Sequence, residues 1–113
     1  GIVVGTGNKV EDYGVGFYTK YGDGGVDIAP IADLYKSEVW DLGKSLGVDS
    51  RIIEAKPTDG LWDDGRTDED QLGATYSELE EAMETGKGTG LKVLEEYARM
   101  NAHKMNPIPT FTL

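Results

Sequence analysis

Hydrophobic residues are spaced differently at the start of the chain and along the rest of it. Ile2-Val3-Val4 is a continuous apolar run bounded by glycine, which is typical of a strand buried on both faces. After about residue 30, apolar side chains recur at intervals of three and four, the spacing of one helix face. A strand, a glycine-rich loop and then helices together predict part of an α/β layer.

Asp33 begins the clearest of the predicted helices, and Gly47 ends it. Its apolar face is formed by Tyr35, Val39, Leu42 and Leu46. Residues 51–55 add one or two helical turns. Trp40 is expected to lie in the core on this first helix.

Two further helices are predicted in the second half of the chain. Thr75 and Glu78 have the spacing of a capping box, which opens a helix reaching about Glu84. The last helix is amphipathic and is followed by a tail that two prolines hold extended. Its apolar face is formed by Leu91, Leu94, Tyr97 and Ala98, of which Tyr97 is expected to pack in the core.

The first 25 residues hold eight of the 16 glycines, and we expect them to be mostly turns and loops. Asn8 can cap a short helix with Glu11 as its partner, and glycine ends that helix by Gly16. Residues 15–21 are expected to be extended and residues 22–25 to form a loop. A second, longer ordered loop is predicted over residues 56–68.

Composition narrows the class of partner. The 113 residues carry a net charge of −10, which argues against a nucleic-acid backbone or an anionic membrane surface as the main partner. No apolar run approaches the roughly 20 residues of a membrane span, and the first residues do not have the pattern of a signal peptide, so we expect none. Cysteine is absent, which excludes disulfides and thiolate chemistry. We therefore expect a cytoplasmic protein with a thin core, and a strand on the first residues suggests that a segment upstream is missing.

Several residues are candidates for binding or catalysis, and each could also have a purely structural role. The Gly5-Thr6-Gly7 turn is either a nucleotide-binding edge or an ordinary strand-to-helix turn. Glu11 either closes its capping box or supplies a hard oxygen ligand for Mg²⁺. Asp23, at the tip of a glycine loop beside Lys20 and Asp27, either lies in a solvated turn or orients an amine and accepts its proton.

The remaining candidates are weaker. Lys36 lies in the first turn of its helix, where a cation is mildly unfavourable unless an anion shares the site. His103 and Lys104 lie at the end of the last helix, either as surface residues or as an anion-binding pair. The acidic stretch 59–70 fails the calcium-loop pattern, because Asp64 stands where glycine is required.

Taken together, these segments resemble the NAD synthetase family, in its smaller ammonia-dependent form. The resemblance runs in order and spacing over residues 3–84, with a weaker match at residues 103–104. The matching segments are Val4-Gly5-Thr6-Gly7-Asn8 with Glu11, residues 16–25 with Asp27 and Pro30, Leu34-Tyr35-Lys36, residues 56–62, and residues 67–73 with Tyr76.

The resemblance implies an adenine-nucleotide α-hydrolase-like (Rossmann-like) fold with a parallel sheet. It implies a ligase in which ATP adenylates the carboxylate of deamido-NAD and ammonia then displaces AMP to give NAD. It also implies a homodimer. The implied roles are ATP contacts for Thr6, Lys36 and Thr58, Mg²⁺ binding for Glu11, deamido-NAD contacts for Lys20, Asp27, His103 and Lys104, and positioning of ammonium for Asp23.

One part of the family pattern is missing. The Ser-Gly-Gly-x-Asp-Ser loop that binds pyrophosphate does not occur here. Residues 1–113 therefore look like the C-terminal portion of a single catalytic domain, which we expect to be inactive alone. Three alternatives stay open: a non-catalytic nucleotide-binding or regulatory module, an acidic interaction domain without a ligand, and the synthetase portion of a glutamine-dependent enzyme.

Overall fold

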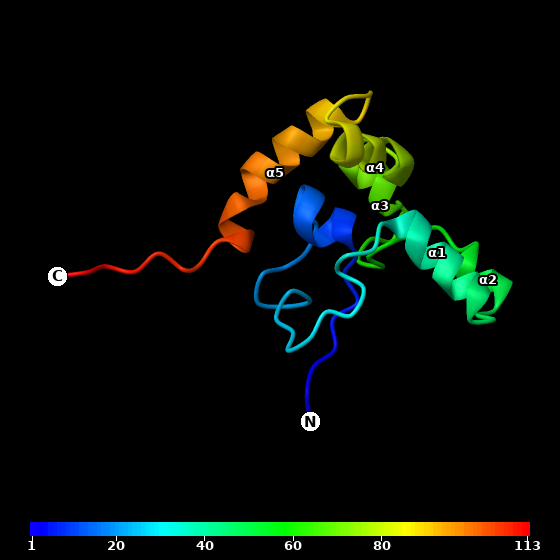
Figure 1. The fold of residues 1–113 in the computed structure, drawn as a ribbon, viewed down its shortest axis with the longest axis horizontal. Coiled ribbons are helices and arrows are strands. Elements are labelled where there is room, and N and C mark those ends of the chain that lie inside the picture. Colours follow the sequence, from blue (N-terminus) through cyan, green and yellow to red (C-terminus); the bar gives the residue numbers. More distant parts are fainter.

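Short helices make up most of the regular structure in the computed structural model, which describes residues 1–113. They are a π-helix η1 (Val10–Val15) and the α-helices α1 (Lys36–Ser45), α2 (Ser50–Ile53), α3 (Asp68–Leu72), α4 (Tyr76–Thr85) and α5 (Leu91–Met105). In Figure 1, α1 and α2 extend to the lower right, α4 lies above them beside α3, and α5 descends toward the left into the C-terminal tail. No helix has both the length and the apolar character needed to cross a membrane.

Capping boxes begin two of these helices. At α4, the Thr75 N–H donates to Glu78 Oε2 (2.8 Å) and the Glu78 N–H donates to Thr75 Oγ1 (3.2 Å), as predicted. Thr67 and Asp70 make the same pair of bonds at α3, and Gly73 with φ 78° ends that helix. Helix α3 was not predicted from the sequence, although its Thr-x-x-Asp spacing is a capping pattern.

The predicted cap of the first short helix is confirmed. Asn8 Oδ1 accepts from the N–H groups of Val10 (3.0 Å) and Glu11 (3.2 Å), while the Asn8 N–H donates to Glu11 Oε2 (3.1 Å). The chain leaves η1 at Gly16, whose φ of 68° favours glycine. The expectation that residues 15–21 are extended is wrong, because Val15 still belongs to η1 and the chain turns over residues 20–24.

The core is small and lies where η1 meets α4 and α5. Only 13 of the 113 residues are buried, and six apolar ones form a single cluster. Its members are Val10, Val15, Leu72, Ala74, Tyr76 and Leu79. Tyr97 packs against this cluster, as predicted. Trp40 does not belong to it: the indole is half-buried and meets Tyr76 edge-on, with 6.4 Å between ring centroids.

Helices α1 and α2 contain no buried residue. The predicted apolar face of α1 exists in the sequence, but Leu46 at its end is 73% exposed. The helix also begins at Lys36, three residues later than predicted, with Tyr35 as its N-cap. Its stability therefore rests on its capping bonds and on partial packing rather than on a covered face.

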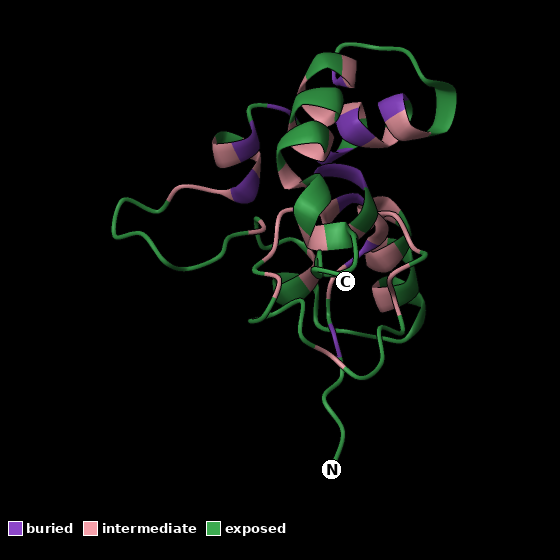
Figure 2. Ribbon diagram, turned by 90° about the vertical axis from the view of Figure 1, so that its left-hand side faces the viewer, coloured by how far each residue is buried: buried purple, intermediate pink, exposed green.

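The expected parallel sheet is not confirmed, because its only trace is a parallel bridge between Val4 and Ile28. The Gly5 N–H donates to the Ile28 carbonyl (2.7 Å), and the Ile28 N–H donates to the Val3 carbonyl (3.2 Å). A segment with one extended neighbour has no sheet around it, so Val3 and Val4 are 55% and 52% exposed. The expectation of a strand buried on both faces is therefore wrong for these residues. Figure 2 shows this end of the chain exposed, with the buried segments confined to the packed part.

Candidate functional site

Five of the predicted site residues line one hollow of about 300 Å³, which we call the acidic hollow. They come from the glycine turn, η1, the second glycine loop, α1 and the 56–67 loop. These residues are Thr6, Glu11, Asp23, Lys36 and Thr58. Segments far apart in the sequence therefore bring the predicted ATP, cation and ammonium residues together.

Glu11 is held in a fixed orientation by two donors. The Tyr76 hydroxyl donates to Glu11 Oε1 (2.8 Å), and the Asn8 N–H donates to Oε2 (3.1 Å). Tyr76 is almost completely buried in the core, so the Glu11 carboxylate is tied to the best-packed part of the molecule. Each of its oxygens keeps a second lone pair, which remains available to a ligand.

Lys36 is the only basic residue that lines the acidic hollow. It is the first residue of α1, and its Nζ lies 5.6 Å from the centroid of the Tyr76 ring and 5.9 Å from that of the Trp40 ring. Five carboxylates face this single ammonium: Glu11, Asp12, Asp23, Asp59 and Asp68. A free polyanion would be repelled here, whereas a cation or a metal-bound nucleotide would not.

Asp12 is an acid of this hollow whose ionisation the fold changes. Burial raises the pKa of Asp12 to about 6, and the neighbouring charges of Glu11 and Asp23 add to this effect. Asp12 was not among the site residues predicted from the sequence. It could not be found from the sequence, because its environment depends on the turn of residues 20–24 that brings Asp23 near.

Asp68 has the least satisfied carboxylate in the molecule. The residue is 8% exposed, and its Oδ1 has no hydrogen-bond partner. Its Oδ2 lies 3.4 Å from the Tyr76 hydroxyl, whose single proton already faces Glu11 Oε1 at 2.8 Å. Burial, followed by the charge of Glu11, raises the pKa of Asp68. Sequence reasoning missed this residue together with α3.

Hydrogen bonds close the base of the loop that carries Thr58. The Asp68 N–H donates to the Pro57 carbonyl (2.9 Å), and the Thr58 hydroxyl donates to the Arg66 carbonyl (3.1 Å). At the tip, the Arg66 guanidinium stacks 4.2 Å from the centroid of the Trp62 ring. Thr58 is thereby positioned at the wall of the acidic hollow.

The acids of the stretch 59–70 mostly bond to their own loop. Asp59 accepts from the Leu61 N–H and from Gln71, and Asp64 pairs with Arg66. No group of three or more His, Cys, Asp or Glu side chains is arranged to hold a metal ion by itself.

Three other predicted residues line a second hollow of about 500 Å³, which we call the lysine hollow: Lys20, His103 and Lys104. Both lysines there connect the glycine loop to the end of α5. Lys20 Nζ donates to the carbonyls of His103 and Asn106 (2.8 Å each). Lys104 Nζ donates to the carbonyls of Gly16 (2.9 Å) and Tyr18 (2.7 Å).

Asp27 lines neither hollow. Its Oδ2 accepts from the Val3 N–H (2.7 Å), beside the Val4–Ile28 bridge. The structure therefore does not bring Asp27 together with the other predicted substrate residues. Tyr18, by contrast, lines both hollows and links them.

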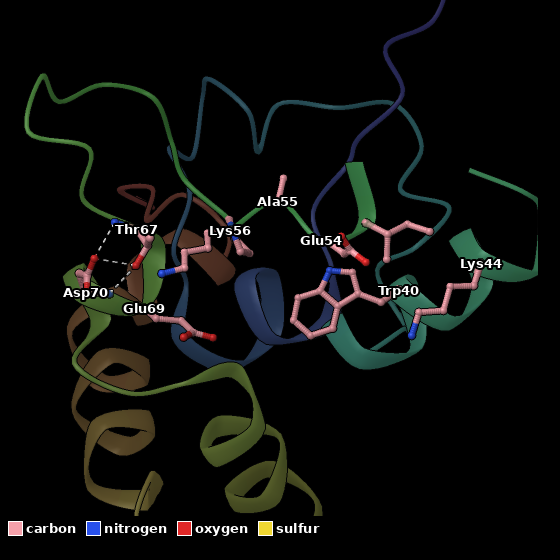
Figure 3. A pocket seen from close by; sticks show the side chains of 10 residues that line it. Trp40, Lys44, Glu54, Ala55, Lys56, Thr67, Glu69 and Asp70 are labelled. Carbon is pink, nitrogen blue, oxygen red and sulfur yellow. Dashed lines mark hydrogen bonds between the residues drawn. The ribbon is translucent and has the colours of Figure 1, made fainter. Parts of the chain in front are cut away.

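A third hollow, of about 520 Å³, lies between α1, α2 and α3. Figure 3 shows Trp40 on one wall and Glu69 and Asp70 of α3 on another, with residues 54–56 passing between. The half-exposed indole explains why the prediction of Trp40 as a core residue was wrong: the face that would be covered borders this hollow. Its lining mixes both charge signs, with Lys44 and Lys56 among the acids.

Solved structures identify the class of protein that has this arrangement. NMN synthetase from Francisella tularensis superposes with a TM-score of 0.85 and 41% identity, covering 99% of this chain and 47% of that one. NH3-dependent NAD synthetase from Campylobacter jejuni, in complex with nitrate ion, has a TM-score of 0.65 and 28% identity over 98% of this chain and 45% of its own. The fold of this chain is therefore similar to about half of each of these two synthetases.

The sequence gives the particular family. The model of the NAD synthase family matches residues 1–109, and the chain belongs to that family. The NH(3)-dependent NAD(+) synthetase of Methanococcoides burtonii is 54% identical over 83 residues, which are 74% of this chain and 31% of that protein. The enzyme of the same name from Archaeoglobus fulgidus is 49% identical over 107 residues, 95% of this chain and 39% of that protein. The chain therefore spans well under half the length of these relatives.

Proposed function

We propose that this chain carries part of the active site of an NH3-dependent NAD synthetase. The reaction is the ATP-dependent amidation of deamido-NAD: the nicotinate carboxylate is adenylated with release of pyrophosphate, and ammonia then displaces AMP to give NAD. One observation supports this best. The residues assigned by resemblance to ATP, cation and ammonium line the acidic hollow, and most of those assigned to deamido-NAD line the adjoining lysine hollow.

In the acidic hollow, Thr6 and Thr58 offer hydroxyls to ATP and Lys36 offers its ammonium to the phosphates. The donor set there is carboxylate and hydroxyl oxygen, which fits Mg²⁺, and Glu11 with its free lone pairs would hold the ion. When bound, Mg²⁺ would neutralise phosphate charge and polarise the bond that is broken. The five acids of the hollow would otherwise repel ATP.

On the wall of the acidic hollow, Asp23 would position ammonium and accept its proton before attack on the adenylate. Its Oδ1 accepts from the Thr19 N–H (2.6 Å), which fixes the carboxylate at the wall of the acidic hollow. Lys20 and Lys104 each use two of three ammonium protons on backbone carbonyls, so one proton of each stays available to an anionic dinucleotide. His103 lines the lysine hollow with these two lysines and would be a further deamido-NAD contact, whereas Asp27 stays a proposed contact that lies outside both hollows.

The proposal extends to the rest of the protein. Residues 1–113 would form the C-terminal portion of the catalytic domain, and residues beyond them would complete the α-hydrolase-like parallel sheet at the exposed Val3 and Val4. The enzyme would act as a homodimer in the cytoplasm. The names of the relatives favour the ammonia-dependent form over the glutamine-dependent one.

The test is binding of ATP by calorimetry with and without Mg²⁺. We expect binding that requires Mg²⁺ and that Lys36→Ala weakens about tenfold, as expected for loss of a charge-assisted hydrogen bond. Lys92→Ala, at an exposed lysine of α5 outside both hollows, serves as the control. Equal affinity of Lys36→Ala and the unmodified protein would reject this site for ATP.

A second candidate substrate follows from the Francisella neighbour, which is an NMN synthetase. An enzyme of that kind would take the mononucleotide counterpart of deamido-NAD. Comparing the binding of nicotinate mononucleotide with that of deamido-NAD distinguishes the two, and only the dinucleotide should need both hollows. We expect deamido-NAD to bind more tightly, and a preference for the mononucleotide would support the second candidate.

A further inference from the structure

Asp68 has a buried carboxylate to which the proposed function assigns no role. It lines the acidic hollow beside Glu11, yet Oδ1 has no partner and Oδ2 shares a hydroxyl whose proton faces another carboxylate. A buried carboxylate without a partner is destabilising unless a cation or a hydrogen-bond donor compensates its charge. Lys36 is the only cationic side chain lining the hollow, and its single positive charge faces five carboxyl groups.

Geometry connects Asp68 to Glu11. Both carboxylates lie against the same phenol oxygen, Glu11 Oε1 at 2.8 Å and Asp68 Oδ2 at 3.4 Å from Tyr76 Oη. Tyr76 therefore lies between two like charges on one wall of the hollow and orients Glu11, while Asp68 is left without a strong donor. A small hard cation is commonly bound by one or two carboxylates together with waters and substrate phosphates, and this pair offers that number.

We propose that Asp68 is a second carboxylate ligand, with Glu11, for the divalent cation of the acidic hollow. The inference rests on the proposed function only in taking the hollow as a cation site. It assigns α3 a functional part, because the capping box of Thr67 and Asp70 determines where Asp68 lies at the start of that helix.

The experiment measures binding of Mn²⁺, used in place of Mg²⁺, by electron paramagnetic resonance on the metal alone. We expect Asp68→Asn and Glu11→Gln each to weaken Mn²⁺ binding about 10- to 100-fold. Asp63→Asn, an exposed acid of the neighbouring loop that does not line the hollow, should bind like the unmodified protein.

Thermal unfolding supplies a second measurement. Without metal, Asp68→Asn should have the same melting temperature as the unmodified protein or a higher one, because the buried charge is gone. Mn²⁺ should raise the melting temperature of the unmodified protein, and it should raise that of Asp68→Asn much less. Binding lost in Glu11→Gln but kept in Asp68→Asn would overturn the inference while leaving the cation site intact. Absence of Mn²⁺ binding in the unmodified protein would overturn the cation site itself.

Discussion

Tyr76 joins the core to the candidate site within one side chain. Its ring is buried among the apolar cluster, while its hydroxyl orients Glu11 and borders Asp68. Burial and the charges of both carboxylates raise its pKa, so the phenol stays protonated and remains a donor at any physiological pH. Packing of the core and geometry of the acidic hollow are therefore coupled at this residue.

Leucines of equal size should respond very differently to truncation according to their burial. Leu79 is fully buried in the cluster around Tyr76, whereas Leu61 is 79% exposed. Leu79→Ala should lower the free energy of unfolding by about 2–5 kcal/mol, because it removes apolar contact and leaves a cavity. Leu61→Ala should change it by less than about 0.5 kcal/mol. Urea unfolding of both variants measures the difference, and similar losses would mean that the core lies elsewhere.

At the scale of elements, local signals predicted more than long-range ones. Asn8 with Glu11 and Thr75 with Glu78 were found from spacing alone, because a cap is satisfied within four residues. The prediction that Val4 is buried was wrong, because its burial would require neighbouring strands and this chain forms only one bridge there. The same limit applies to the site. Motifs and the family resemblance named five residues of the acidic hollow from the sequence, but only the fold shows that Asp12 and Asp68 line it with Glu11.

The capping box of α4 makes the stability of that helix depend on pH. Hydrogen bonds from the Thr75 N–H, and then from the hydroxyls of Thr89 and Thr75, lower the pKa of Glu78 below its usual 4.5. A lowered carboxyl pKa stabilises the fold above the unfolded-state value and loses this effect as pH falls through the folded-state value. The stability gap between the unmodified protein and Glu78→Gln should therefore be present at pH 7 and shrink at pH 3.

Urea unfolding midpoints at the two pH values measure that gap. Glu95→Gln provides the matched control, because Glu95 is an exposed glutamate on α5. Its gap to the unmodified protein should be small and similar at both pH values. A gap for Glu78→Gln that is as large at pH 3 as at pH 7 would show that the ionised carboxylate does not stabilise the cap.

Two lysines hold the glycine loop against α5, and each should protect the loop from opening. Lys104 Nζ donates to two carbonyls of the segment that follows η1, at Gly16 and Tyr18. Hydrogen bonds from a charged donor contribute about 1.5–3 kcal/mol, less where solvent reaches them. Lys104→Met should speed amide hydrogen exchange in residues 16–24 by about tenfold. Mass spectrometry measures this exchange, and Lys92→Met serves as the control in which the rate should not change. An unchanged exchange rate in Lys104→Met would show that the Lys104 hydrogen bonds do not hold residues 16–24 in place.

The whole molecule is more open than a compact domain of its length. Its radius of gyration is 15.2 Å, against about 13 Å expected for a compact chain of this size. The extended tail and the uncovered first residues in Figure 1 account for part of this. A net charge of −10 adds a field that opposes anionic nucleotides, so binding depends on a few local donors and on a cation.

The open structure bears on whether this chain can catalyse the proposed reaction by itself. Catalysis of adenylate transfer needs donors on every charged oxygen of the transition state, held in place and shielded from water. Here the acidic hollow has one lysine, and the sequence lacks the family's pyrophosphate loop. We therefore expect the 113-residue chain to bind ATP with Mg²⁺ but to form no NAD from ATP, Mg²⁺, ammonia and deamido-NAD. Chromatographic detection of NAD measures this. Turnover by the chain alone would mean that its own residues complete the phosphate site, and the proposed division of the catalytic domain would then be wrong.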